Sequence, residues 1–293
     1  MTGTKIDGKI IAQTVKDRVK KSADELKKDG INPCLATVLV GNNPASATYV
    51  KNKHKACEEV GIITKDHKLD ENTTQQQLNS IIDELNQDSS VHGILVQLPL
   101  PKHLSEFETT SRISPLKDVD GLTPHNAGLL AMKKAALVAC TPSGVMEMFD
   151  YHNIELEGKN IVLINRSNLV GKPLYHLLLE KNATVITCHS RTKDIEKFCQ
   201  EADIVITAVG DRTKFILTPE MIKEESIVIE SGSPTVPIVP PFLILMSSTN
   251  VTIPFVSINI AVGAELEPMY FPSPTINPVP SICLLYTSPS PRD

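Results

Sequence analysis

Residues 160–191 read NIVLINRSNLVGKPLYHLLLEKNATVITCHSR, and this stretch decides the fold class. It predicts an apolar strand over Asn160–Ile164, a helix over Pro173–Glu180 and a second strand over Thr184–Cys188. A strand–helix–strand unit is typical of parallel sheets, whose strands read as continuous apolar runs because both faces are buried. The stretch therefore predicts an α/β fold.

The same alternation extends in both directions from this unit. The other predicted elements are a helix over residues 10–26 closed by Gly30, a strand at Cys34–Val40, a helix at Pro44–Val60 closed by Gly61, a strand at Ile62–Leu69, a helix from a Thr73–Gln76 capping box to Leu85, a strand at His92–Leu98, a helix at Asp194–Cys199 and a strand at Ile204–Ala208. We expect two α/β lobes with a hinge around Cys140–Gly158. Ligands of such sheets bind at the carboxyl ends of the strands, so the active site should lie in the cleft between the lobes.

Composition narrows the class of protein. The chain has 293 residues, 41% hydrophobic and 22% charged, which favours a globular protein of two domains. A net charge of −5 disfavours a nucleic-acid partner. Six cysteines without a CxxC pair, and an N-terminus without an apolar signal core, predict a reducing, cytoplasmic location. Cys188 and His189 lack partners at ligand spacing, so we expect no metal.

The character of the sequence changes near Gly232. Residues 231–264 contain no charged residue, and 12 of the 21 prolines lie after residue 232. The interrupted apolar run is too short to cross a bilayer. We therefore predict a catalytic domain at 1–145, a Rossmann-like dinucleotide-binding domain at 146–232, and an aberrant Pro-rich tail at 233–293 that arises from a frameshift or a wrong gene model and does not pack. A genuine Pro-rich extension is the alternative.

The turn after the first strand of the opening stretch is a candidate anion site. It lacks a GxGxxG fingerprint and keeps only Gly171, so an ordinary loop between strand and helix remains an alternative. The turn would aim backbone N–H groups at a phosphate. The next strand ends in CHSRT, where an NAD site commonly has an acid. The donors are His189, Ser190 and Arg191 together with Arg166 and Ser167, and they favour the 2′-phosphate of NADP.

Five polar residues in the first half of the chain could converge on a substrate. Tyr49 and Lys53 are four apart and share one face of a predicted helix, although a solvated basic face is the simpler interpretation. Gln97 ends an apolar strand before two prolines, which places an amide at the crevice. Asp118 and Asp120 lie in a loop, where an acid binds a ligand or caps a turn.

Several residues and motifs together match one known family: Tyr49, Lys53, VQLPLP (96–101), KDVDGL (117–122), CTPSG (140–144), NRSNLVGKP (165–173) and NATVITCHSRT (182–192). At these positions the sequence closely resembles the bifunctional methylenetetrahydrofolate dehydrogenase and methenyltetrahydrofolate cyclohydrolase family. The resemblance spans about residues 5–230. It is more specific than the Tyr-x-x-x-Lys pair alone, which short-chain dehydrogenases share.

The resemblance implies an activity. The chain would oxidise 5,10-methylenetetrahydrofolate with NADP and hydrolyse the methenyl product to 10-formyltetrahydrofolate, in one-carbon metabolism and purine biosynthesis. Lys53 would assist proton transfer, Gln97 would orient Lys53, Tyr49 would pack against the folate, and Asp120 would hold the pterin-like ring. No metal is implied, and a cytoplasmic homodimer would fit the family.

The sequence departs from the family at several positions. Asn165 stands where a glycine is common, and because asparagine tolerates left-handed backbone conformations better than most residues, it need not abolish the turn. Ala139 replaces a proline, and the family's Asp-Val-Gly-Ile segment reads Glu230-Ser-Gly-Ser here. The family's glycine-rich loop and final helix are missing after Gly232. Two alternatives therefore remain, an impaired folate- or nucleotide-binding chain and another two-lobe NADP-dependent dehydrogenase.

Overall fold

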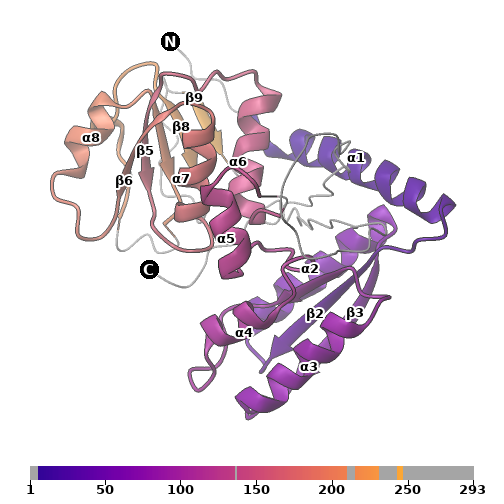
Figure 1. Ribbon diagram of the computed structural model, residues 1–293. Helices are drawn as coiled ribbons and strands as arrows, with labels where there is room; N and C mark the ends of the chain where they lie inside the picture. The colour runs from indigo at the N-terminus through magenta and orange to yellow at the C-terminus, as the bar shows by residue number, and fades with distance from the viewer. Residues whose placement is uncertain (1–5, 136, 210–214, 231–242, 247–293) are drawn as a thin grey trace.

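Two parallel sheets form the two lobes of the computed structural model (Figure 1), which describes residues 6–135, 137–209, 215–230 and 243–246. The first sheet has three strands in the order β3-β2-β4, and the second has six in the order β1-β9-β8-β7-β5-β6. An α/β fold with two parallel sheets is confirmed. No helix in the described ranges is long and apolar enough to span a membrane.

The first lobe is built around β2. Its strands are β2 (Cys34–Val40), β3 (Ile63–Leu69) and β4 (Gly93–Val96), and its helices are α1 (Gly8–Lys28), α2 (Pro44–Val60), α3 (Gln75–Gln87) and α4 (Glu106–Arg112). Side chains alternate across β2. Leu35 packs in one cluster with Cys57 of α2, whereas Ala36 and Val38 pack with Leu78 of α3 on the opposite face. The sheet is therefore covered by helices on both sides.

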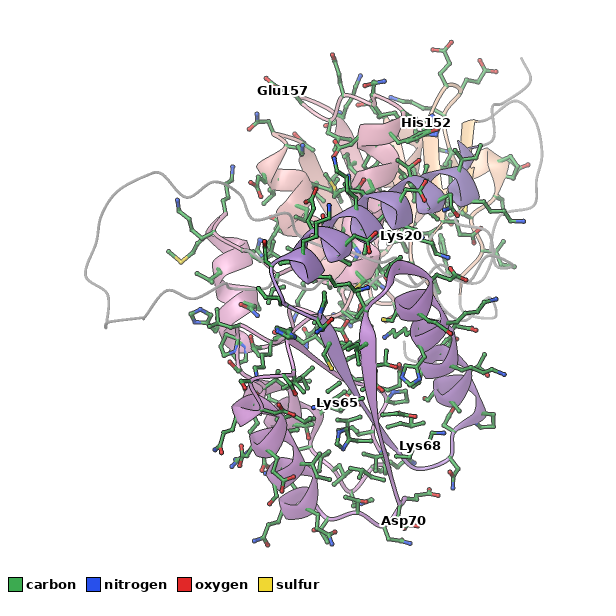
Figure 2. The ribbon with its side chains drawn as sticks, turned by 90° about the vertical axis from the view of Figure 1, so that its right-hand side faces the viewer. Lys20, Lys65, Lys68, Asp70, His152 and Glu157 are labelled. Atoms are coloured by element: carbon green, nitrogen blue, oxygen red, sulfur yellow. The ribbon has the colours of Figure 1, made fainter. Side chains whose placement is uncertain are left out.

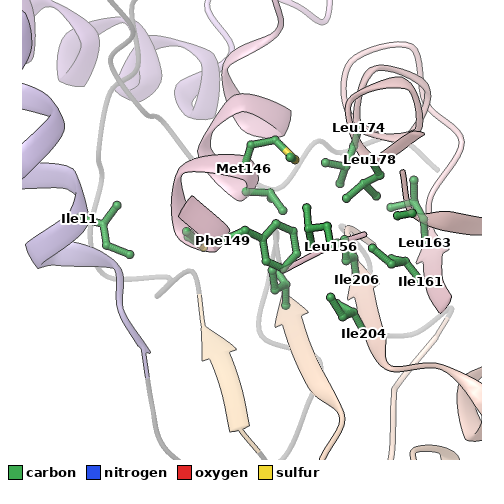
Figure 3. Packing of buried hydrophobic residues seen from close by; sticks show 14 residues of the cluster. Ile11, Met146, Phe149, Leu156, Ile161, Leu163, Leu174, Leu178, Ile204 and Ile206 are labelled. Atoms are coloured by element: carbon green, nitrogen blue, oxygen red, sulfur yellow. The ribbon is translucent and has the colours of Figure 1, made fainter. Parts of the chain in front are cut away.

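The second lobe has a doubly wound arrangement. Its strands are β1 (Ile6–Asp7), β5 (Asn160–Ile164), β6 (Thr184–Cys188), β7 (Ile204–Thr207), β8 (Ile227–Glu230) and β9 (Leu243–Met246); its helical elements are α5 (Pro124–Ala131), α6 (Cys140–Tyr151), α7 (Gly171–Glu180), α8 (Ile195–Glu201) and the short 3-10 helix Pro219–Met221. Figure 3 shows Phe149 of α6 and Leu174 of α7 against Ile161 and Ile206 of the sheet. In the sheet, β5 lies between β6 and β7. The strand order reverses between β5 and β7, and sheets of this kind bind nucleotides at such a switch point.

Helix α1 contributes to the cores of both lobes. Ile11 belongs to the same buried cluster as Phe149 in the core of the second lobe. The α1 residues in the core of the first lobe are Ala12, Val15, Val19 and Ala23. Figure 2 shows α1, which carries Lys20, between the first lobe at Lys65 and the second lobe at His152. Ion pairs join α1 to both sides, Lys16 to Glu59 of α2 and Arg18 to Glu147 of α6.

Three expectations about local structure are corrected. The capping box joins Thr74 to Gln77, one residue after the predicted Thr73–Gln76 pair. The region around Cys140–Gly158, which we expected to be a hinge, contains helix α6. The apolar side chains of this helix pack into the core. A strand, β9, forms in the predicted tail, where four apolar residues pair between β1 and β8. The rest of the tail lies outside the described residues.

Candidate active site

Helix α2 positions the predicted pair Tyr49 and Lys53. Asn43 caps the helix by accepting hydrogen bonds from two backbone N–H groups of its first turn, and Gly61 ends it with a φ of 78°. Lys53 is only 8% exposed, whereas Tyr49, one turn earlier, is half-buried. One turn after Lys53, Cys57 packs against β4 and the loop that follows α4. The interpretation of this helix surface as a solvated basic face is therefore wrong for Lys53, whose side chain is buried.

Gln97 continues the pairing of β4 beyond its last assigned residue. Its backbone N–H donates to the carbonyl of Val38 at 2.8 Å, so side-chain alternation extends to it. Leu95 lies in the cluster with Cys57, and Gln97, two residues later, belongs to the same face of the sheet. Its Nε2 donates to the Leu98 carbonyl at 2.7 Å, while Oε1 is buried and accepts no hydrogen bond from any described residue. A buried acceptor without a donor is costly and marks a position that a ligand or another polar group would complete.

Asp118 and Asp120 have different functions in one loop. Asp118 is 1% exposed, and its carboxylate accepts hydrogen bonds from the Leu122 and Thr123 N–H groups and from Asn126 Nδ2, at 2.8–3.2 Å. Asp118 therefore stabilises the turn that leads into α5. The alternative that an acid in this loop caps a turn is correct for Asp118.

The Asp120 carboxyl group lies in a desolvated and electrostatically coupled place. Burial raises its pKa, the positive charge of Lys53 lowers it, and Asp118 raises it again. The Cys140 thiol at the start of α6 lies 3.9 Å from Asp120 Oδ1. The structure thus brings together an amine from α2, a carboxyl group from the loop and a thiol from α6.

The loop is anchored on both sides of Asp118. Lys117 Nζ donates to the carbonyls of Leu85, Asn86 and Asp88 at the end of α3, at 2.8–3.0 Å. Asp118 pairs with Ile94 in a parallel bridge, so the chain toward Asp120 runs in the same direction as β4 toward Gln97. The sequence analysis missed Lys117 and Cys140, although both lie in motifs that it quoted.

In the second lobe, the Asn165 side chain organises the turn after β5. Its Oδ1 accepts from the N–H groups of Ser167 and Gly171, and its Nδ2 donates to the Ala208 carbonyl after β7 at 2.8 Å. Asn165 is not among the residues with a positive φ, and its side-chain hydrogen bonds hold the turn without a left-handed backbone. The amide bridges the two strand ends of the switch point.

Gly171 is required by close packing. A Cβ at this position would lie 2.4 Å from the Asn165 carbonyl oxygen. The N–H groups of Val170, Gly171 and Lys172 all donate within the loop, and residue 173 is a proline. The prediction that these backbone groups face an anion is therefore wrong for the first turn of α7.

The predicted phosphate-binding side chains lie at adjacent strand ends. Ile164 of β5 pairs with Cys188 of β6, so Arg166 and Ser190 each lie two residues beyond this pair. Arg166, Ser190 and Arg191 are exposed, and Ser167 is half-buried. No acid occurs between residues 164 and 193, apart from Glu180 at the far end of α7. Exposed cationic and hydroxyl donors without a nearby acid suit the 2′-phosphate of NADP. Among the described residues, no cluster of three or more metal-ligating side chains occurs.

Comparisons with known proteins match the two parts of the chain to two different domains of one family. Residues 6–120 match the catalytic domain of tetrahydrofolate dehydrogenase/cyclohydrolase, and residues 139–240 match its NAD(P)-binding domain. A bifunctional protein FolD from Nitrosopumilus maritimus is 83% identical over 230 residues, 78% of this chain and 80% of that protein. The FolD crystal structure from Campylobacter jejuni is 44% identical with a TM-score of 0.75 and covers 78% of this chain and 80% of its own. The Trypanosoma brucei enzyme, complexed with NADP and an inhibitor, is 30% identical with a TM-score of 0.78 and covers 85% and 91%.

Proposed function

The chain belongs to the tetrahydrofolate dehydrogenase/cyclohydrolase family, and on this premise we propose how its residues divide two reactions. It is a bifunctional enzyme with NADP as its cofactor. It oxidises 5,10-methylenetetrahydrofolate to the 5,10-methenyl derivative and hydrolyses that product to 10-formyltetrahydrofolate. The observation that carries the assignment of residues is the coupling of buried Lys53 to the desolvated Asp120 carboxyl group.

In the oxidation, a hydride leaves the methylene carbon and the remaining cation is shared by the two flanking nitrogens. NADP, when bound, accepts that hydride. We assign Arg166, Ser167, Ser190 and Arg191 to its phosphates, and Asn165 to the shape of the loop that carries two of them. Tyr49 packs against the folate, and the Asp120 carboxyl group holds the pterin-like ring. The protein contributes alignment, which accounts for much of the rate when reacting atoms are held close.

In the hydrolysis, water adds to the methenyl carbon, a proton leaves the water, and one carbon–nitrogen bond breaks to leave a formyl group. Lys53 Nζ is assigned to accept and return the proton, because it is a buried amine whose charge is coupled to the Asp120 carboxyl group. The Asp120 carboxyl group supplies the nearby acidic partner. Gln97, whose Oε1 accepts no hydrogen bond from a described residue, orients the ammonium group.

The proposal also covers the location, metabolic role, oligomeric state and domain boundaries of the enzyme. We assign the enzyme to the cytoplasm, to supply of 10-formyltetrahydrofolate for purine biosynthesis, and to a homodimer paired through the second lobe. A catalytic domain at 1–145, a cofactor domain at 146–232 and an aberrant Pro-rich tail at 233–293 complete the proposal. Absence of a nucleic-acid partner fits the net charge of −5.

The test is a direct assay of the purified chain. With 5,10-methylenetetrahydrofolate and NADP we expect NADPH and 10-formyltetrahydrofolate in equal amounts after both steps. The assay is repeated with methenyltetrahydrofolate alone, which isolates the hydrolysis. Tight binding of folate and NADP without turnover would overturn the proposal in favour of a binding protein.

A further inference from the structure

The turn that follows β6 is closed from both ends. The N–H of His189 donates to Thr192 Oγ1 at 2.9 Å, and the N–H of Thr192 donates back to the His189 carbonyl at 2.8 Å. The N–H of Arg191 donates to His189 Nδ1 at 3.1 Å. Three hydrogen bonds thus fix four consecutive residues, and the two at the apex, Ser190 and Arg191, remain exposed.

The Thr192 hydroxyl also joins this turn to the core. Burial raises the pKa of the Cys188 thiol, which is fully buried at the end of β6, and the Thr192 side chain lowers it. Cys188 packs with Ile164 and Cys199 in the cluster between the sheet and α8. A single hydroxyl group therefore connects the exposed apex to the rigid end of a strand.

We propose that Thr192 is a positioning residue that sets the preference for NADP over NAD, an inference that rests on the proposed function. A 2′-phosphate gains charge-assisted hydrogen bonds from Ser190 and Arg191 only if both point at it together. Holding the turn in that form before the cofactor arrives removes most of the cost of ordering it. NAD lacks the 2′-phosphate, so the order of this turn does not affect its binding.

The position of the turn supports this role. Cys188 pairs with Ile164, and neighbouring parallel strands lie about 4.8 Å apart, so the turn stands beside the loop that carries Arg166. Arg166 and Ser190 lie at the same level beyond the sheet. A shift of the turn would separate donors that must meet one phosphate group, whereas the switch point between β5 and β7 would be unchanged.

The experiment compares dissociation constants for NADP and NAD, measured by calorimetry on the full chain. Thr192→Val keeps the shape and removes the hydroxyl; Thr192→Ser restores it. We expect Thr192→Val to weaken NADP about tenfold and NAD less than twofold, with Thr192→Ser close to the parent chain. Thr184→Val, at the exposed opposite end of β6, is the matched control and should change neither constant.

The outcomes separate the alternatives. Equal weakening of both cofactors by Thr192→Val, or no change in either, would overturn the proposal. If Thr192→Val does not fold, His189→Ala takes its place, because it removes the acceptor of the Arg191 N–H and should weaken NADP about threefold and leave NAD unchanged. A parent chain without any preference for NADP would instead contradict the cofactor assignment of the proposed function, and that result needs no variant.

Discussion

The two lobes present their chemistry in opposite ways. In the first, Lys53 is buried and the Asp120 carboxyl group is desolvated, and a loop anchored by Lys117 and Asp118 holds them in place. In the second, Arg166 and Arg191 are exposed on turns closed by their own hydrogen bonds. The difference matches the proposed roles. The proton transfer is assigned to groups in a desolvated place, and recognition of a phosphate to charges on fixed turns.

The largest expected effect tests whether burial in the first lobe serves proton transfer. Lys53→Met keeps the length of the side chain and removes the amine. We expect cyclohydrolase turnover to fall about 10²- to 10⁴-fold, while dehydrogenase turnover falls far less, because only hydrolysis needs the proton acceptor. Lys55→Met, an exposed lysine on the same helix, is the control. Small and equal losses in both activities would remove the assigned role.

The next effect separates the two acids of the loop. Asp118→Ala would leave the N–H groups of Leu122 and Thr123 and the Asn126 amide without their acceptor, and we expect it to cost about 3 kcal/mol of stability. Asp120→Asn should cost little stability and weaken folate binding. Thermal melts and folate titrations on both variants check this, and a reversed pattern would show that the two acids have been assigned the wrong way round.

A smaller effect tests the packing of the second lobe. Gly171→Ala would place a Cβ 2.4 Å from the Asn165 carbonyl oxygen, and we expect a loss of about 1–3 kcal/mol together with weaker NADP binding. Gly128→Ala is the matched control within helix α5, where a Cβ meets nothing within 4 Å. It should gain about 0.5–1 kcal/mol. Chemical denaturation gives both values, and equal signs for the two would contradict the close approach at Gly171.

The smallest effect concerns pH. Burial raises the pKa of the Asp120 carboxyl group above its unfolded value of 3.8, so the folded state holds this proton more tightly than the unfolded state. Its contribution to stability is fully present below that value and is lost as the pH rises through the folded pKa. Asp120→Asn removes the titration. The melting temperature of the variant relative to the parent should therefore rise with pH above about 4, and a constant difference from pH 3.5 to 7 would contradict it.

Local sequence patterns predicted the helices and strands. The arrangement of side chains in the candidate site depends on contacts that form only in the folded chain. Helix Pro44–Val60 was predictable because a proline opens it and Gly61 ends it. The capping box was misplaced because Thr73 and Thr74 are adjacent and each has a glutamine three residues later. Nothing local separates Asp118 from Asp120, since the donors that occupy Asp118 come from the turn formed only after folding.

The candidate site shows the same limit in the second lobe. The residue types after β5 and β6 predicted the donors of a phosphate site, because composition alone reveals the missing acid. The function of Asn165 depends on the Ala208 carbonyl, 43 residues away, and no pattern around Asn165 indicates that partner.

Helix α1 has a consequence for how the protein folds and can be divided. It gives Ile11 to one core and Val15 and Val19 to the other, and β1, which precedes it, pairs in the second sheet with β9. A cut at residue 145 would take a strand and a core side chain from the second lobe along with the first. We therefore expect the two lobes to melt in one cooperative transition, although their sheets are separate.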